Sequence, residues 1–165
     1  MHTLPAAGRA AATPEALYAE LQLSLKGLLD GEHDLIANAA NFAALVYQTL
    51  PELNWAGFYF LRGDELVLGP FQGRPACVRI AIGRGVCGTA AQRRESVLVP
   101  DVQQFPGHIA CDVASRSELV VPLLQSGRLL GVFDLDSPRP GRFSAVDRAG
   151  IEQATRTLMD ACKIP

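Results

Sequence analysis

The stretch GHIACDVASRSE, residues 107–118, surrounds a cysteine with groups that could do chemistry. His108 lies three residues before Cys111, Asp112 follows it directly, and Glu118 comes seven residues later. A free thiol that only fills space normally lies within an apolar run, because it behaves as a small hydrophobic group. Cys111 lies instead in a polar, glycine-led loop, so we predict a reactive thiol at this position.

Two further cysteines, Cys77 and Cys87, lie in loop-rich segments before Cys111. Cys87 stands at the start of a predicted helix, where backbone N–H groups and the helix dipole are expected to lower the pKa of its thiol. Cys162 continues the apolar stripe of the last predicted helix, and we interpret it as an inert core thiol. Each loop cysteine alone could be a spectator, but three in loops favour a redox role.

The cysteine spacings argue against a zinc site. Nine residues separate Cys77 from Cys87 and 23 separate Cys87 from Cys111, whereas zinc sites typically use closely spaced C-x2-C pairs. We therefore expect no metal, and a metal site that uses His108 is the less favoured alternative.

A hairpin is predicted from strands at 118–124 and 128–136. A two-residue loop would mix apolar and charged rows, whereas a three-residue loop over 125–127 pairs Leu124 with Arg128 and keeps the rows separate. A slip of one residue would exchange the two faces, so the hydrophobic pattern favours the three-residue loop. One face then carries an apolar row made of Leu119, Val121, Leu123, Leu129, Gly131 and Phe133.

The other face of this hairpin gathers three carboxylates, Glu118, Asp134 and Asp136. They end or interrupt strongly apolar strands, where a charge is costly unless it has a partner or a function. Clustered carboxylates raise one another's pKa, so one could stay protonated and donate to an oxygen while another binds an ammonium group. The alternative is that all three are solvated residues at strand ends.

The strand NWAGFYFL, residues 54–61, is apolar on both faces, so both are expected to be covered. Trp55 and Tyr59 share one side, and we assign them to the wall of a pocket over the acidic face. The alternative, that both are simple core aromatic residues, is at least equally compatible with the pattern.

The remaining elements place these groups in an α+β fold. Helices are predicted from Thr13-Pro14 and over 34–50, and strands over 54–61 and 65–71. Residues 76–95 read as a short strand, a glycine-rich turn and a short helix, and a brief strand follows at 96–99. A closing helix begins at Ser144. We predict a mostly antiparallel sheet with helices on one face and a pocket on the other.

Composition limits the class of protein. The 165 residues fit a single domain over 13–165, with residues 1–12 expected to be disordered. A net charge of −2 gives no electrostatic footprint for nucleic acid or an anionic membrane. Neither a membrane span nor a secretory signal is recognisable, so a cytoplasmic address is expected, where cysteines are normally free, metal-bound or redox-active.

Several motifs together resemble the free methionine-(R)-sulfoxide reductase family, a catalytic branch of GAF domains. The resemblance covers residues 13–162 and is carried by NWAGFYF, GPFQGRPAC, IGRGVCGTAA, VPDVQQFPGHIACD, SRSELVVPL and GVFDLDSP. It implies a homodimeric GAF fold that encloses a free amino acid. It also implies that thioredoxin supplies the electrons and that no cofactor is bound.

The resemblance assigns roles to individual residues. Cys111 is expected to be the catalytic thiol, Cys77 the principal resolving thiol, and Cys87 a third redox cysteine. The substrate-binding positions are expected to be Trp55, Tyr59, Glu118, Asp134 and Asp136. The implied reaction reduces free L-methionine-(R)-sulfoxide through a sulfenic acid and an intramolecular disulfide.

Two other classes of function compete with this interpretation. A non-catalytic GAF sensor would bind a small molecule, although an acidic pocket suits no phosphate and no output domain fits within the chain. A peroxide-reactive thiol protein would share the cysteines but would not need three acids and an aromatic wall.

Overall fold

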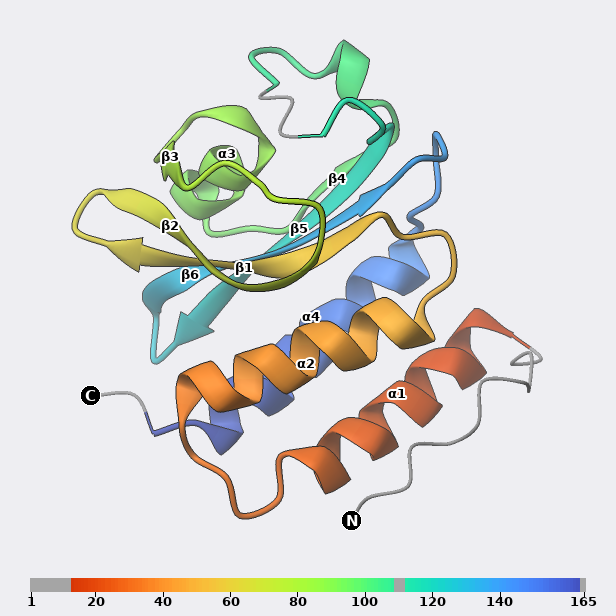
Figure 1. The fold of residues 1–165 in the computed structure, drawn as a ribbon, viewed down its shortest axis with the longest axis vertical. Coiled ribbons are helices and arrows are strands. Elements are labelled where there is room, and N and C mark those ends of the chain that lie inside the picture. Colours follow the sequence, from red (N-terminus) through yellow and green to blue (C-terminus); the bar gives the residue numbers. More distant parts are fainter. Residues whose placement is uncertain (1–12, 109–111, 164–165) are drawn as a thin grey trace.

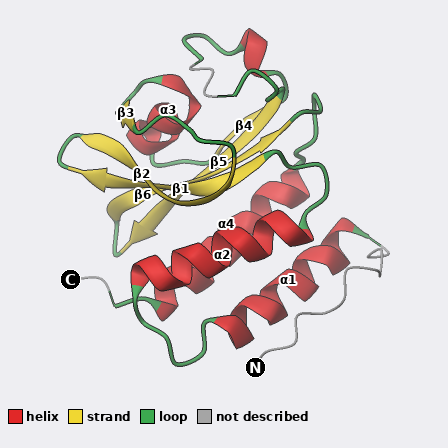
Figure 2. Ribbon diagram, viewed as in Figure 1, coloured by secondary structure: helices red, strands yellow, loops and turns green. Residues whose placement is uncertain are grey.

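The computed structural model describes residues 13–108 and 112–163. Six antiparallel strands form one sheet in the order β3-β2-β1-β6-β5-β4. Three long helices, α1, α2 and α4, lie on one side of this sheet, while α3 lies on the other (Figures 1 and 2). The predicted α+β class is therefore confirmed, and the predicted disorder of residues 1–12 lies outside the described residues.

The elements follow the chain in an order close to the predicted one. They are α1 (Pro14–Leu28), α2 (Leu35–Thr49), β1 (Trp55–Arg62), β2 (Glu65–Gly73), β3 (Arg79–Ala81), α3 (Gly85–Arg93), β4 (Val97–Val99), the 3-10 turn η1 (Val102–Gln104), β5 (Ser117–Gln125), β6 (Arg128–Ser137) and α4 (Ala145–Ala161).

The long helices begin where side chains can accept their free N–H groups. The Thr13 hydroxyl accepts a hydrogen bond from the Ala16 amide, and Pro14 occupies the first turn of α1. The Asp34 carboxylate accepts from the Ala37 amide at the start of α2. These caps satisfy donors that a helix leaves unpaired, so the predicted helix starts are confirmed.

A buried network joins α1 to the start of α4. Ser144 and Asp147 form a capping box, in which each side chain accepts from the other's backbone N–H. The Tyr18 hydroxyl donates to Asp147 at 2.8 Å, and Arg142 lies 3.1 Å from the same oxygen. Gly150 permits this approach, because a Cβ there would lie 2.3 Å from the Tyr18 ring.

Alternation along the strands separates two hydrophobic clusters. Phe58 and Phe133 point towards the long helices and pack around Phe42 of α2, with ring centroids 4.6 to 5.5 Å apart. Trp55 and Tyr59 point to the other side and join residues of α3 in the second cluster. Both faces of β1 are therefore covered, as its apolar sequence predicts.

The predicted three-residue hairpin loop is wrong. Ser126 and Gly127, with φ of 50° and 75°, form a two-residue turn that pairs Gln125 with Arg128. A bulge at Leu130 then adds one residue to β6 and shifts the register. The mixing of apolar and charged rows expected of a two-residue loop does not occur, because the bulge restores their separation.

The predicted distribution of acids between the faces nevertheless holds. Beyond the bulge, Leu119 pairs with Leu135 and Glu118 with Asp136, so the acids share the face opposite the long helices. Leu129, placed on the helix face by the predicted register, belongs instead to the cluster on the pocket side. Gly131 is required beside the bulge, because a Cβ there would lie 2.2 Å from the Tyr59 carbonyl oxygen.

Within residues 13–108 and 112–163, no helix has both the length and the apolar character to cross a membrane.

We expect Asp147→Ala to lower the free energy of unfolding by about 2–4 kcal/mol, since it removes a helix cap and leaves Arg142 and Tyr18 without their buried partner. Urea denaturation followed by circular dichroism measures this loss. Asp160→Ala, at an exposed position of the same helix, is the matched control and is expected to change stability by less than about 0.5 kcal/mol. Equal effects of the two substitutions would contradict the structural role of Asp147.

Candidate functional site

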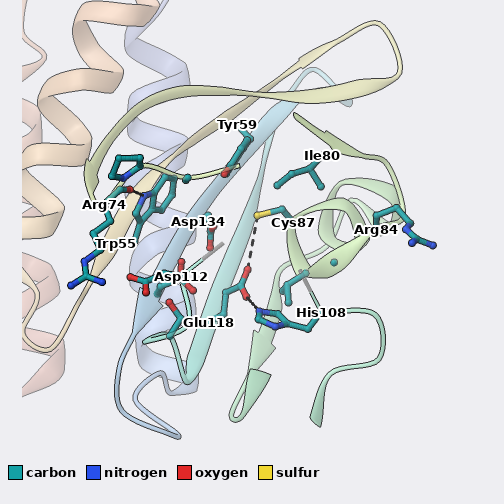
Figure 3. A pocket seen from close by; sticks show the side chains of 16 residues that line it. Trp55, Tyr59, Arg74, Ile80, Arg84, Cys87, His108, Asp112, Glu118 and Asp134 are labelled. Atoms are coloured by element: carbon teal, nitrogen blue, oxygen red, sulfur yellow. Dashed lines mark hydrogen bonds and ion pairs between the residues drawn. The ribbon is translucent and has the colours of Figure 1, made fainter. Parts of the chain in front are cut away.

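A pocket lies on the sheet face opposite the long helices, between the strands and α3 (Figure 3). Its floor comes from β1, β5 and β6, and one wall from the first turn of α3. The enclosed space is about 40 Å³, far below the roughly 300–1,000 Å³ typical of ligand pockets, so a ligand of amino-acid size requires the lining segments to move. The lining residues are Trp55, Tyr59, Arg74, Pro75, Ala76, Ile80, Arg84, Gly85, Val86, Cys87, His108, Asp112, Ser115, Glu118, Asp134 and Asp136.

Three carboxylates converge in this pocket, as the sequence predicts. Glu118 and Asp134 are each only 6% exposed, and Asp136 is half-buried. Glu118 lies between two other side chains, with Oε1 4.0 Å from the Cys87 sulfur and Oε2 3.7 Å from His108 Nε2 (Figure 3). Asp134 Oδ1 is buried and has no hydrogen-bond partner within the described parts of the chain.

No lysine or arginine among the described residues forms an ion pair with these acids. Arg74 and Arg84 line the edges of the pocket, but their guanidinium groups point away from the carboxylates (Figure 3). Among the described residues, His108 is the only basic side chain that forms an ion-pair contact with them, and burial lowers its pKa, which favours the neutral ring. Bound protons must therefore neutralise most of the negative charge of the three acids.

The pKa values of all three acids are raised. Burial is the main cause for Glu118, and the charges of Asp134 and Asp136 add to it. Burial likewise raises the pKa of Asp136, with a further contribution from Asp134. Burial raises the pKa of Asp134 to about 7, although hydrogen bonds from Cys87, Glu118 and the Leu135 amide lower it in part. All three shifts therefore favour the protonated acid over the ionised carboxylate relative to an exposed side chain.

The predicted lowering of the Cys87 pKa is wrong. Cys87 does lie in the first turn of α3, but burial raises the pKa of its thiol, and the charges of Asp134, Glu118 and Asp136 raise it further. The thiol is only 4% exposed and donates to Glu118. Desolvation and three facing acids outweigh the helix dipole, so Cys87 is a neutral thiol in this arrangement.

Trp55 and Tyr59 both line the pocket, and both also belong to the second hydrophobic cluster. The Trp55 indole N–H donates to the Arg74 carbonyl at 3.1 Å, and the Tyr59 hydroxyl donates to the Cys77 carbonyl at 3.0 Å. The two aromatic residues therefore serve as pocket wall and core, and they also anchor the segment that follows β2.

The cysteines differ in their chemical state. Cys77 is disulfide-bonded, whereas Cys87 and Cys162 are free. Cys162 is buried under the long helices, as predicted for an inert core thiol. Cys111, the predicted reactive thiol, lies outside the described residues.

The sequence analysis did not identify some of the polar residues in and beside the pocket. Asn54 donates to the Asp112 carboxylate at 3.1 Å and to the Ser115 hydroxyl at 3.0 Å, which joins the start of β1 to the loop before β5. A hydrogen bond from Ser115 acts to lower the pKa of Asp136, though burial still dominates. The only available signal was the position of Asn54 directly before the aromatic strand, because its partners are some 60 residues away.

The chain is similar to known proteins in both sequence and fold. Residues 37–161 match the GAF domain family. The chain is 50% identical over 141 residues to the free methionine-R-sulfoxide reductase of Escherichia coli K12, which covers 86% of each protein. It is 42% identical over 156 residues to that of Saccharomyces cerevisiae, covering 90% of this chain and 87% of the yeast protein.

A solved structure shows similarity to the chain in fold as well as in sequence. The free methionine-R-sulfoxide reductase of Neisseria meningitidis in complex with its substrate aligns with a TM-score of 0.91 at 41% identity. This alignment covers 98% of the present chain and 95% of the other.

We expect Asp134→Asn to stabilise the protein increasingly as the pH rises from 4 to 8. Since the folded state raises the pKa of Asp134 from 3.8 to about 7, the folded protein binds a proton more tightly than the unfolded chain. The contribution of Asp134 to stability is then complete below pH 4 and is lost as the pH rises towards 7, by up to about 4 kcal/mol. Asparagine does not ionise and avoids this loss.

Urea denaturation of both proteins at several pH values tests this expectation. Asp64→Asn, in the exposed turn between β1 and β2, should follow the wild-type pH dependence. A constant difference in stability between Asp134→Asn and the wild type would contradict the raised pKa.

Proposed function

Because the chain belongs to the free methionine-R-sulfoxide reductase family of GAF domain proteins, we propose that it reduces free L-methionine-(R)-sulfoxide to L-methionine. The observation that carries this proposal is a pocket in which two buried carboxylates and a half-buried one lie beside an aromatic wall. A free amino acid offers an ammonium group and a sulfoxide oxygen, and the two protonation states of the acid cluster suit one group each.

In this proposal the three acids have different roles in binding the substrate. Ionised Asp134 holds the substrate ammonium, and a protonated Glu118 or Asp136 donates a hydrogen bond to the sulfoxide oxygen. Withdrawal of electrons through that oxygen makes the sulfur electrophilic. Trp55 and Tyr59 pack against the apolar part of the substrate, and enclosure of both polar ends leaves no path for a polypeptide.

The redox steps use the cysteines. The Cys111 thiolate attacks the sulfoxide sulfur, the oxygen passes to Cys111 with a proton from the acid, and methionine and a sulfenic acid result. The Cys77 thiol then condenses with the sulfenic acid to form a disulfide and water. A dithiol of the thioredoxin type restores both thiols by exchange and becomes a disulfide itself.

The state of the other cysteines supports Cys77 as the principal resolving residue. Cys77 is disulfide-bonded while Cys87 and Cys162 are free, so Cys77 is the one of these three whose thiol is oxidised. Cys87 remains the third redox cysteine of the proposal, but it acts after Cys77, because a buried neutral thiol is a poor nucleophile. The hydrogen bond from Tyr59 to the Cys77 carbonyl ties the resolving segment to the pocket wall.

Three further features belong to the proposal. We propose a homodimer, as the family resemblance implies. We propose thioredoxin as the electron donor and a cytoplasmic address, since regeneration of the thiols requires a reducing compartment. The proposed cycle uses no bound cofactor, because the electrons reside in cysteine sulfur throughout.

An assay coupled to thioredoxin, thioredoxin reductase and NADPH tests the activity. The substrates compared are free L-methionine-(R)-sulfoxide, its S epimer, a peptide-bound sulfoxide and hydrogen peroxide. We expect turnover of the free R form alone. Turnover of peroxide without any sulfoxide would replace the proposal with a peroxide-reactive thiol protein, and inactivity towards all four would favour a GAF sensor.

We expect Cys111→Ser to lower kcat/KM to below about a thousandth of the wild-type value, because the reaction loses its nucleophile. Cys162→Ser is the matched control, since Cys162 lies under the long helices and not in the pocket. Circular dichroism should show both variants folded. Full activity of folded Cys111→Ser would refute the assignment.

A further inference from the structure

We propose that a thiophilic divalent cation such as Zn²⁺ binds in the pocket through the Cys87 thiolate and the carboxylates of Glu118 and Asp134. The cation site rests on the geometry of the pocket alone. Its consequence, competition between the cation and methionine sulfoxide, rests on the proposed function.

The three groups lie close enough to share one ion. A ligand atom from each of Cys87, Glu118 and Asp134 lies within 4.8 Å of the others. Zinc binds sulfur at about 2.3 Å and carboxylate oxygen at about 2.0–2.2 Å, which brings such donors to roughly 3.5 Å from one another in a tetrahedral site. Each side chain then needs to move by about 1 Å or less.

A separate observation identifies a buried acceptor that the described protein groups leave unpaired. Asp134 Oδ1 is buried at the pocket floor and has no hydrogen-bond partner within the described parts of the chain. A buried polar atom is almost always paired with protein, water or an ion. The neighbouring groups supply no strong positive charge, so a cation is the ligand whose chemistry this oxygen fits.

His108 lies next to Glu118 but outside the group of three whose ligand atoms are within 4.8 Å of one another, so it would have to move to become a fourth ligand. Its Nε2 lies 3.7 Å from Glu118 Oε2, and its side chain is 18% exposed at the pocket mouth. Its neutral form can coordinate through a ring nitrogen. A set of one sulfur, one nitrogen and two carboxylate oxygens suits zinc, whereas calcium and magnesium prefer oxygen ligands alone.

No sequence motif reveals this set, because its members lie far apart along the chain. Cys87 comes from α3, Glu118 from β5 and Asp134 from β6, and the sheet register brings them together. Binding must release the protons that the buried groups hold, so the affinity should rise with pH.

A titration with Co²⁺ tests the site directly, because a cobalt–thiolate bond gives a charge-transfer absorption band. The protein is kept with Cys77 disulfide-bonded, so that the free cysteines of the described chain are Cys87 and Cys162. We expect one equivalent of Co²⁺ to bind at pH 8 with this band, Zn²⁺ to displace it, and the affinity to fall at pH 6.

Two variants and a control locate the ion. Cys87→Ser should abolish the band and weaken binding by at least about tenfold, whereas Cys162→Ser should retain both. Asp134→Asn should weaken binding without loss of stability, which separates a lost ligand from a lost fold. An unchanged band in Cys87→Ser, or no binding by the wild type, would overturn the proposal.

Competition separates the cation site from the proposed function. We expect methionine sulfoxide to raise the apparent dissociation constant of Co²⁺. Binding of Co²⁺ that the sulfoxide does not weaken would uphold the cation site and count against the pocket as the substrate site.

Discussion

Burial of three carboxylates on one face of the sheet is the constraint on which the pocket depends. An ionised carboxylate loses water as a partner when buried, and only a counter-charge, a hydrogen bond or a proton can compensate. No arginine or lysine of the described chain pairs with these acids. Protons and the weak donor at Cys87 fill that role, so the pocket combines neutral acids with the capacity to accept a positive charge.

The fold remains stable despite the free-energy cost of burying these acids, because a large hydrophobic cluster packs on the other face of the sheet. There the long helices cover a continuous apolar layer, and Asp147, a buried acid on that side, has both hydrogen-bond and ion-pair partners. Burial alone would raise the pKa of Asp147, but hydrogen bonds from Ser144 and Tyr18 and the charge of Arg142 lower it overall. The charge of Asp147 therefore stabilises the protein at neutral pH and is lost on acidification, the reverse of the behaviour of Asp134.

Sequence patterns predicted the features that depend on local chemistry. Caps at Thr13, Asp34 and Ser144 marked the helix starts, and alternation in β1 and β5 assigned side chains to the two faces. The bulge at Leu130 was missed because it depends on the contact of Gly131 with the neighbouring strand. The predicted lowering of the Cys87 pKa was wrong for a similar reason. The helix start can be recognised in the sequence, but the acids that face the thiol come from two strands far along the chain.

The helix dipole and the acid cluster oppose each other at Cys87, and the outcome bears on how the pocket can be used. A thiol held neutral by carboxylates cannot compete with an exposed thiolate as a nucleophile, but it can donate a hydrogen bond to Glu118 while the pocket lacks a cation. Arrival of a positive charge changes this balance, because it favours ionised acids and a thiolate together. An ammonium group pairs with the carboxylates and can at most donate a hydrogen bond to the sulfur, since it forms no coordinate bond to a thiolate. A thiophilic metal ion can satisfy both, so discrimination between the two depends on whether the Cys87 proton is retained.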